Sequence, residues 1–430
     1  MPVPQGWRVS AIKRRYAVVL GKMLASSPEG STWRALPYVR AANVQDGWVD
    51  VADLKEMWFS PSEVHDLRLR EGDLLVCEGG DVGRCAIWDA PLQDVCFQNS
   101  VNRVRSRGAD STRFLAYALH SLKALGAIDA LCNRATIAHF TAEKLGACAI
   151  ALPPPDEQHA IADFLDRETA RIDALVAKQG EFLARLDEHR RALVTEVVTR
   201  GLRRNVPTKS PAHEWLSSIP AHWEERALGS FATKITNGYV GPTRDILVGD
   251  GVTYLQSLHI KHNRITFDGK YFVSAPWSAA HAKSILKAGD VLIVQTGDIG
   301  QVAVVPPEFE GANCHALIII RTREDVMQGE YLAWLLNSEF GVQSLRSIQT
   351  GALHPHLNCG NVKFLRLPVP PLEEQAAIID CLNDRVARLD ILRARGTEMI
   401  ERLREHRAAL ITAAVTGGLR VAERVAAEAA

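Results

Sequence analysis

The chain has 430 residues, of which 47% are hydrophobic and 23% charged, with 50 basic and 50 acidic side chains. This length allows two to four domains that each bury a core, and the composition excludes the disordered and fibrous classes. No apolar run approaches the roughly 18 residues of a membrane span, and the N-terminal region has no apolar signal core, so we expect a cytoplasmic protein that does not enter membranes.

The eight cysteines are spread through apolar stretches and form no CxxC pair. Their spacing offers neither a disulfide framework nor a zinc site, so we interpret them as reduced structural thiols. They are Cys77, Cys85, Cys96, Cys132, Cys148, Cys314, Cys359 and Cys381.

Residues 1–151 predict a globular domain of mixed strands and helices. Residues 87–106 contain apolar runs typical of strands, whereas residues 114–125, FLAYALHSLKAL, have helical spacing. The segment GDLLVCEGGDVG at residues 72–83 predicts a turn, a strand and a second glycine turn. Because it lacks the GxxxxGK[ST] pattern of a phosphate-binding loop, we interpret it as structural.

Residues 152–203 predict a long amphipathic helix. Pro153 to Pro155 stand before it and Gly201 marks its end, so the helix has up to about 45 residues and a length of about 65 Å. Its apolar residues recur mostly at steps of three, four or seven, the pattern of a coiled-coil seam. They are Ile161, Leu165, Ile172, Leu175, Leu183, Leu186, Leu193 and Val197.

A second globular domain and a second helix follow in residues 204–366 and 367–430. In the globule, residues 314–322, CHALIIIRT, read as a strand, and residues 331–345, YLAWLLNSEFGVQSL, as a helix. Gly418 marks the end of the second long helix. Its apolar stripe consists of Ile378, Leu382, Leu389, Leu392, Ile400, Leu403 and Leu410.

The two halves are copies of one plan. Residues 157–202 return as residues 374–419 with 24 of 46 aligned positions identical, and residues 72–83 match GDVLIVQTGDIG at residues 289–300. Elsewhere the globules differ almost completely. Since each apolar stripe needs a partner, the two helices pack most simply as an antiparallel coiled coil. We therefore predict an α+β protein with two mixed α/β domains, separated by two long helices and related by a pseudo-twofold internal repeat.

Charge is distributed unevenly along the chain. Residues 1–150 hold 18 basic and 16 acidic side chains and residues 203–366 hold 16 and 14, whereas residues 151–202 hold 7 and 10. The globules are thus slightly basic and the helices slightly acidic. This asymmetry permits nucleic-acid binding by the globules but does not establish it.

Several repeated segments together resemble the specificity subunit of type I restriction-modification systems. They are LPPPDEQ and LPVPPLEEQ running into the long helices, IPAHWEERALG at residues 219–229, and the YVRAANV, GDLLVCEGG and FQN series of the first domain. The resemblance covers essentially the whole chain and repeats in the expected order.

The resemblance implies a role for each part. Each globule would be a target recognition domain that reads one half of a bipartite, asymmetric site in double-stranded DNA, and the helices would set the distance between the halves. Two adenine methyltransferase subunits would dock beside the helices, and two restriction and translocation subunits would join them. The chain itself would be non-catalytic and hold no cofactor, with S-adenosylmethionine, ATP and magnesium bound by the partner subunits.

Candidate base-reading residues are polar side chains at positions where the two globules diverge. Arginine pairs with guanine, and asparagine or glutamine with adenine, through two hydrogen bonds each. In the first domain the candidates are Arg40, Asn43, Arg84, Gln98, Asn99, Arg103, Arg134, Thr136 and His139. In the second domain they are Gln256, His259, Gln301, His315, Thr350, His354, His356 and Asn358.

Candidate partner-binding residues lie in the repeated helices. The Glu-Gln pair opens each helix and the EHR triplet recurs in its last third, where it is either a solvated face with arginine stems over the seam or a docking surface. These residues are Glu157, Gln158, Glu188, His189, Arg190, Glu374, Gln375, Glu405, His406 and Arg407.

Three other functions remain open. A protein of the same architecture could serve a methyltransferase system without a nuclease or belong to a fused-type restriction enzyme, and a neighbouring nuclease-helicase gene would discriminate. A coiled-coil scaffold whose globules bind proteins or sugars would give no DNA footprint. An enzyme is opposed by the lack of methyltransferase, Walker, HExxH and GxSxG motifs and of any repeated catalytic cluster.

Overall fold

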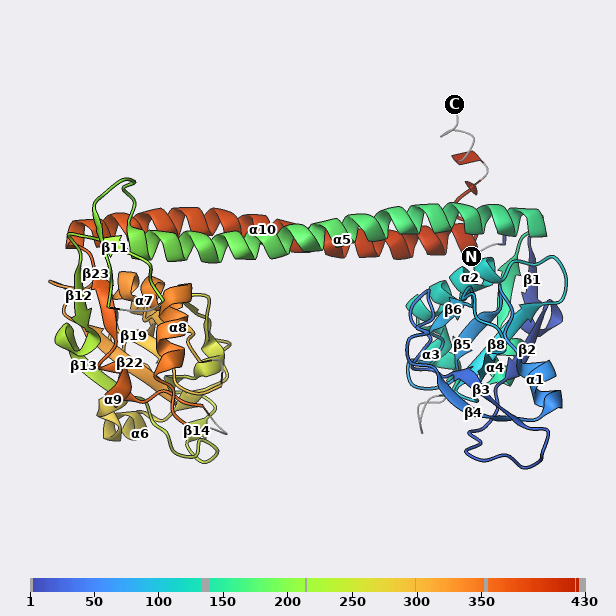
Figure 1. Cartoon of the computed structure of the whole chain (residues 1–430), viewed down its shortest axis with the longest axis horizontal. Helices are drawn as coiled ribbons and strands as arrows, with labels where there is room; N and C mark the ends of the chain where they lie inside the picture. Colours follow the sequence, from blue (N-terminus) through green and yellow to red (C-terminus); the bar gives the residue numbers. More distant parts are fainter. Residues whose placement is uncertain are drawn as a thin grey trace. The chain divides into compact units, whose positions relative to one another are not determined.

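A computed structural model of the chain describes residues 3–132, 139–212, 215–297, 299–351, 355–421 and 423–424. The chain divides into two compact units, the first made of residues 1–180 with 398–430 and the second of residues 181–397 (Figure 1). Each unit therefore contains one globule together with part of both long helices. No helix of the described residues is long and apolar enough to cross a membrane.

The first unit is built from nine strands, four short α-helices and one 3-10 helix (Ile12–Arg14) among its described residues, together with its share of the long helices. The strands are β1 (Arg8–Ala11), β2 (Tyr16–Leu20), β3 (Arg34–Val39), β4 (Lys55–Phe59), β5 (Leu74–Cys77), β6 (Cys85–Ile87), β7 (Cys96–Phe97), β8 (Val101–Ser106) and β9 (Ala149–Leu152). The helices are α1 (Pro61–Leu67), α2 (Thr112–Ala124), α3 (Ala127–Leu131) and α4 (Ala142–Ala147).

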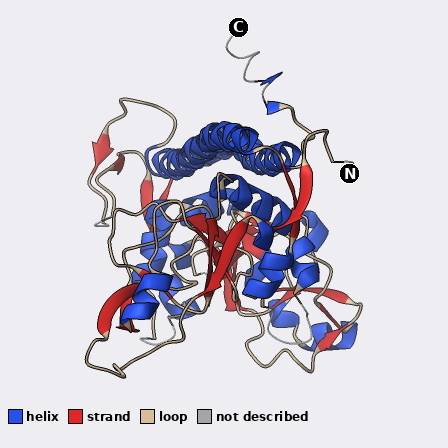
Figure 2. Cartoon of the chain, turned by 90° about the vertical axis from the view of Figure 1, so that its right-hand side faces the viewer, coloured by secondary structure: helices blue, strands red, loops and turns tan. Residues whose placement is uncertain are grey.

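These strands form two sheets and a separate ribbon. The larger sheet has the order β2-β8-β5-β6 and is antiparallel throughout, and the smaller has the order β4-β3-β7 with β3 and β7 parallel. The ribbon pairs β1 with β9, which leads directly into the first long helix. Figure 2 shows the long helices side by side, seen along their length, above the strands.

The second unit has the following elements among its described residues. The strands are β10 (Thr208–Lys209), β11 (Ile219–Pro220), β12 (Glu224–Ala227), β13 (Ala232–Asn237), β14 (Leu247–Val248), β15 (Val252–Leu255), β16 (Ile260–Lys261), β17 (Arg264–Ile265), β18 (Phe272–Val273), β19 (Val291–Val294), β20 (Val302–Val304), β21 (Asn313–Cys314), β22 (Leu317–Thr322) and β23 (Arg366–Val369). The helices are α6 (Ala275–Ala280), α7 (Gly329–Asn337), α8 (Glu339–Ser347) and α9 (Cys359–Val362).

The second unit repeats the topology of the first. One of its four-stranded sheets has the order β13-β22-β19-β20, the other has the order β14-β18-β15-β21 with β15 and β21 parallel, and β12 pairs with β23 before the second long helix. The strands and helices predicted from the sequence are confirmed, with two differences. The segment predicted as one strand at residues 314–322 holds the end of β21 and all of β22, because Ala316 between them has a φ of 48° and interrupts the extended backbone. The segment predicted as one helix at residues 331–345 is two helices, because the Ser338 hydroxyl accepts a hydrogen bond from the Gly341 amide and starts α8 anew.

The repeated Gly-Asp turn is structural, as predicted. Gly72 and Gly289 have φ angles of 83° and 84°, which favour glycine. The following aspartates, Asp73 and Asp290, accept hydrogen bonds from the backbone amides of Arg70 and Lys287 at 2.8 and 2.9 Å. Each turn therefore fixes the start of the central strand of its sheet, β5 or β19.

The two long helices are α5 (Pro155–Arg200) and α10 (Leu372–Val415). In the first unit, Ile161 and Leu165 of α5 share a core with Leu410 and Ile411 of α10. In the second unit, the late α5 residues Leu193 and Val197 share a core with the early α10 residues Ile378 and Leu382. The order of these contacts confirms that the helices pack antiparallel.

The apolar stripe is only partly a helix–helix seam. Leu175 and Leu392, which the sequence assigns to the stripe, are 46% and 44% exposed, whereas Phe164 and Val198 lie outside the predicted stripe and are completely buried. Both belong to cores that also contain residues of the adjacent globule. α5 thus has further apolar residues that pack on the first globule at Phe164 and on the second globule at Val198, which a heptad pattern does not reveal.

Candidate nucleic-acid interface

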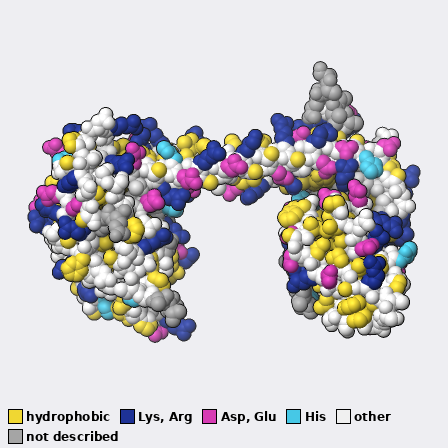
Figure 3. Space-filling view, viewed as in Figure 1, with side chains coloured by type: hydrophobic (Ala, Val, Ile, Leu, Met, Phe, Trp, Pro, Cys, Tyr) yellow, Lys and Arg dark blue, Asp and Glu magenta, His cyan; other side chains and the backbone are white. Residues whose placement is uncertain are grey.

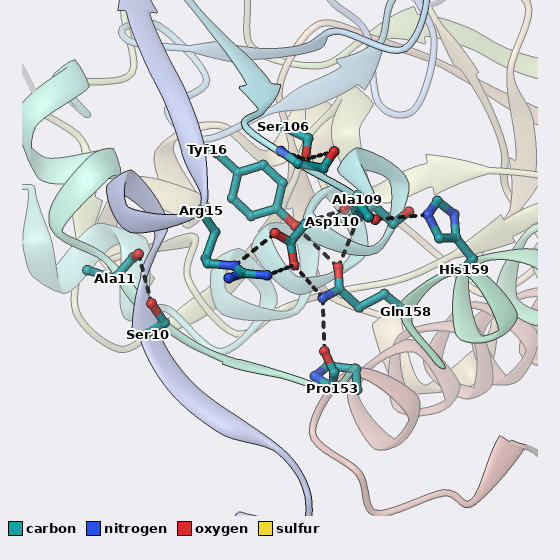
Figure 4. A network of polar contacts seen from close by, with 12 residues as sticks. Ser10, Ala11, Arg15, Tyr16, Ser106, Ala109, Asp110, Pro153, Gln158 and His159 are labelled. Atoms are coloured by element: carbon teal, nitrogen blue, oxygen red, sulfur yellow. Dashed lines mark hydrogen bonds and ion pairs between the residues drawn. The ribbon is translucent and has the colours of Figure 1, made fainter. Parts of the chain in front are cut away.

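The glutamine of each Glu-Gln pair fastens its helix to its own globule. The Gln158 side chain accepts a hydrogen bond from the Ser111 amide at 2.9 Å and donates to the Asp110 carboxylate at 2.8 Å and the Pro153 carbonyl at 2.9 Å (Figure 4). Gln375 accepts from the Gln328 amide at 2.8 Å and donates to two carbonyl groups.

Both glutamine residues are completely buried, so the prediction that they contact a partner is wrong in this structure. A buried amide has to be hydrogen-bonded on both its oxygen and its nitrogen, and these two use the protein interior for that purpose. Their repetition in the sequence reflects the same attachment made twice.

The glutamate of each pair holds a tryptophan. Trp7 donates its indole hydrogen to Glu157 at 3.1 Å, and Trp223 donates to Glu374 at 2.8 Å. Glu374 also lies 2.7 Å from Nε2 of His222. Burial opposes ionisation of Glu374, but the bonds from Trp223 and His222 outweigh it and lower the pKa of this carboxyl. These contacts give both glutamates a role within their own unit.

The EHR triplets divide into two kinds of residue. The arginines form ion pairs between the helices: Arg407 lies 3.0 Å from Asp173, and Arg190 lies 3.7 Å from Asp390. The glutamates and histidines of the triplets are exposed: they are Glu188, His189, Glu405 and His406. The arginines thus lie over the seam, and only the other four residues remain available to a partner.

Three of the predicted base-reading residues are buried and serve the fold. Asn43 is 2% exposed and its amide group donates to the carbonyls of Asp50 and Asp53. Arg103 is 5% exposed and donates to the carbonyl of Asp66 at 2.8 Å. His259 is 1% exposed, and its Nδ1 accepts the amide hydrogen of Gln256. The prediction that these three side chains read bases is wrong in this structure.

Four further candidates are partly occupied by contacts inside the protein. Arg40 pairs with Asp53 at 2.6 Å, and Arg84 donates to the Ala41 carbonyl at 2.9 Å. Gln301 accepts from the backbone amide of His262, and Asn358 caps α9 through the Asn361 amide; these are contacts of their oxygen atoms. Their functional groups are therefore oriented by the fold.

The remaining described candidates are at least partly accessible. Gln98, Asn99, Gln256, His315 and His356 are partly buried, and His139 and Thr350 are exposed. Burial lowers the pKa of His315, which favours its neutral ring. The predicted residues Arg134, Thr136 and His354 lie outside the described residues.

The structure adds residues that the sequence does not single out. Lys22 forms a backbone bridge to Gln98, and Tyr239 forms the same bridge to His315. The available signal is the glycine before each, Gly21 and Gly238, which are separated by the repeat distance of 217 residues. The two candidates Gln98 and His315 therefore occupy equivalent positions in the two globules.

Charge does not mark one obvious binding face. On the face drawn in Figure 3, basic and acidic side chains are interspersed over each unit. Much of the basic charge is also paired, as in Arg105 with Asp73 and Arg321 with Asp290. On this face, therefore, no single-sign patch of charge marks a binding surface.

Comparison with known proteins assigns the family. The model of the type I restriction modification DNA specificity domain matches residues 35–181 and again residues 220–402. The chain is 23% identical over 314 residues to the type I restriction enzyme EcoBI specificity subunit of Escherichia coli, which covers 71% of this chain and 65% of that protein. It is 21% identical over 431 residues to the putative type I restriction enzyme MjaX specificity subunit of Methanocaldococcus jannaschii, covering 97% and 95% of the two chains.

A solved structure has the same fold. A chain from a study of complex assembly and conformational transition of the type I R-M system aligns with a TM-score of 0.75 at 18% identity, covering 97% of this chain and all of that one. Because the family model accounts for more than half of the sequence in two separate matches, one for each globule with its adjoining helix, this chain belongs to the family of type I restriction-modification DNA specificity subunits.

Proposed function

We propose that this chain is the DNA-recognition subunit of a type I restriction-modification complex and that each globule reads one half of a bipartite, asymmetric site. The observation that carries the proposal is the repeated topology of the two sheets with different side chains at equivalent positions, such as Gln98 and His315. Because the two globules share a backbone fold, each would bind the DNA duplex in the same orientation. Different side chains then give the two halves of the site different bases.

The proposal assigns the chemistry to partner subunits. Methylation of adenine and cleavage would be performed by methyltransferase and nuclease-translocase subunits that bind S-adenosylmethionine, ATP and magnesium, while this chain supplies no catalytic group. In support, Gln158 and Asp73, two polar residues that recur at the repeat distance, are used in the fold. The exposed pairs Glu188 and His189, and Glu405 and His406, are the candidates for contact with a methyltransferase subunit.

The function is tested by expressing the chain with the methyltransferase encoded beside it in a host free of adenine methylation and sequencing the host DNA for N6-methyladenine. The proposal predicts one methylated motif with two specified halves and an unspecified gap. A soluble, associated pair of proteins that leaves no methylated motif would contradict it and favour a scaffold whose globules bind other ligands.

A further inference from the structure

Both globules contain the same junction of three strand ends. In the first, the chain leaves β2 through Gly21 and Lys22, whose amides donate to the carbonyls of Val101 and Phe97 at 3.2 and 3.1 Å. In return, the Asn99 amide donates to the Lys22 carbonyl at 2.9 Å. The Gln98 amide donates to the carbonyl of Val39, where the parallel strand β3 ends.

The second globule repeats each of these four backbone bonds. The amides of Gly238 and Tyr239 donate to the carbonyls of Leu317 and Cys314 at 2.8 and 2.9 Å. The amides of Ala316 and His315 donate to the carbonyls of Tyr239 and Leu255, each at 2.8 Å. Since all eight bonds use backbone atoms, the geometry of the strand-end junction does not depend on its side chains.

A glycine fixes the approach of the strands in both copies. A Cβ atom on Gly21 would lie 2.3 Å from the Gln98 carbonyl oxygen, and one on Gly238 would lie 2.5 Å from the Cys314 carbonyl oxygen. Any larger residue would push the strand ends apart. The junction is thus constrained at the one position where its two copies are identical.

The side chains that leave this backbone are different in the two globules. In the first, the Lys22 ammonium lies 2.5 Å from the Glu63 carboxylate and 3.9 Å from the ring centre of Trp33. In the second, the Tyr239 ring packs edge-on against Trp277, with 5.2 Å between ring centres. Glu63 and Trp277 are equivalent, because each is the third residue after the serine that caps α1 or α6.

The bridged residues Gln98 and His315 differ in the same way. Oε1 of Gln98 accepts a hydrogen bond from the Ser100 hydroxyl at 3.1 Å, so its Nε2 is left without a hydrogen bond among the described residues. Nδ1 of His315 lies 3.5 Å from the Tyr254 hydroxyl. Both side chains are thus oriented by a hydroxyl neighbour, and both are partly exposed.

An exposed aliphatic side chain lies beside the junction in both copies. Met23 is 74% exposed and Val240 is 62% exposed, and each follows directly on the bridged Lys22 or Tyr239. In Figure 1, α1 and α6, which supply Glu63 and Trp277, lie on the sides of their units that face away from α5 and α10. An accessible aliphatic residue next to an oriented polar one suits the edge of a base pair, where a thymine methyl lies beside hydrogen-bonding groups.

We propose that the strand-end junction is the specificity-determining site of each globule. Gln98 with Lys22 and Met23 would read the first half-site, and His315 with Tyr239 and Val240 the second. The inference rests on the proposed function and adds to it the residues that carry the choice of base. Because Nε2 of Gln98 is a donor, the matching atom on the DNA is an acceptor, which is O6 or N7 of guanine, N7 of adenine or O4 of thymine.

The inference is tested by sequencing the methylated motif of variant complexes made with the cognate methyltransferase. Gln98→Leu should lower methylation of sites with the original first half by about 10- to 100-fold, as expected for the loss of a good base contact. It should leave the second half unchanged, and His315→Leu should have the opposite effect. Gln93→Leu is the matched control, because Gln93 is an exposed glutamine of the same globule that precedes β7.

A second variant keeps the test informative if Gln98→Leu does not fold. Gln98→Glu has the same shape and retains the acceptor for Ser100, but it replaces the donor with an acceptor and should therefore also alter the first half-site alone. Folded variants that methylate the wild-type motif normally, or that lose both halves equally, would overturn the inference. A wild-type complex without any bipartite motif would instead overturn the proposed function, and this inference with it.

Discussion

Arg105 donates two hydrogen bonds of 2.6 Å, from Nε and Nη2, to the carboxylate of Asp73, whose side chain is 1% exposed. Arg321 and Asp290 form the same pair in the second globule, with both distances 2.7 Å. A bidentate ion pair between a buried aspartate and a partly exposed arginine is therefore part of the framework that both globules share. The ion pair also explains why the Gly-Asp turn is the same in both globules, whereas most of the surrounding residues differ between them.

Removing the arginine should destabilise only the globule that contains it. Arg105→Ala leaves the Asp73 carboxylate buried with one backbone amide as a donor, and we expect a loss of about 3 kcal/mol in the free energy of unfolding. Hydrogen exchange measured by mass spectrometry should show faster exchange in residues 72–77 and no change in residues 289–294. The exposed Arg107 provides the control, since Arg107→Ala should leave the rate of hydrogen exchange in both regions unchanged. Equal effects on the two globules would contradict independent frameworks.

Substitutions of the glutamines near the start of the long helices, Gln158 and Gln375, allow the stability of the two units to be compared. Gln158→Ala and Gln375→Ala each leave buried amide and carbonyl groups unpaired, and each should cost about 1–3 kcal/mol of unfolding free energy. Gln158→Glu should be worse than Gln375→Glu in thermal unfolding. The reason is that Gln158 donates to the Asp110 carboxylate, whereas the donor contacts of Gln375 are to carbonyl groups. If the folded Gln158 and Gln375 variants instead lost only methyltransferase binding, the structural role would be wrong.

Acidification should weaken the second unit before the first. Burial lowers the pKa of His259 and His315 below the ordinary 6.5, so the unfolded chain binds protons there more readily than the folded one. The stability associated with these neutral rings is complete above pH 6.5 and is lost as the pH falls through their folded-state pKa values. In the first unit, the hydrogen bond from His120 lowers the pKa of Asp46 below 3.8, so the corresponding loss occurs at lower pH.

The measurement is hydrogen exchange of both units at neutral pH and at about pH 5.5, where the two histidines are mostly protonated in the unfolded chain but Asp46 stays ionised in both states. Protection of the second unit should fall relative to the first. Substituting both histidines by asparagine should reduce the difference, and the remainder should come from His262, whose pKa is also lowered by burial. A first unit that loses as much protection as the second over this interval would refute the assignment.

The ion pairs over the helix seam should contribute little to the free energy that holds the two long helices together. Arg407 and Asp173 have side chains that are 26% and 55% exposed, so a double-mutant cycle with alanine should give a coupling of about 0.2–1 kcal/mol that decreases with salt. Arg190 and Asp390 should behave in the same way. A coupling above this range would mean that the pairs, and not the apolar contacts of Leu193 and Ile411, hold the helices together.

The parts of the fold that could be predicted are those that repeat or have a period. The two long helices follow from apolar spacing and from the glycine after α5, where Gly201 has a φ of 74°. At the end of α10 it is Gly417, with a φ of 75°, that has this conformation, one residue before the predicted Gly418. The seam was harder to assign, because Phe164 and Val198 pack on the globules, and tertiary contacts of this kind have no local signature.

The candidate site was less predictable for a physical reason. Asn43, Arg103 and His259 are polar residues at divergent positions, but each satisfies buried backbone groups, and a sequence does not distinguish a buried polar residue from an exposed one. Lys22 and Tyr239 become visible only when the strand ends are brought together by backbone hydrogen bonds. Divergence alone therefore selects too many residues, and equivalent placement in the two globules selects among them.

The central claim is that the two globules are interchangeable readers on one framework, and an exchange of globules tests it most directly. The exchange would replace residues 12–148 with residues 228–365. The ends match, because the amide of Ile12 donates to the Cys148 carbonyl and that of Leu228 to the Leu365 carbonyl. Together with the methyltransferase, the chimaera should methylate a motif whose two halves carry the same bases, those of the original second half-site. A folded chimaera that still methylates the original asymmetric motif would contradict the claim.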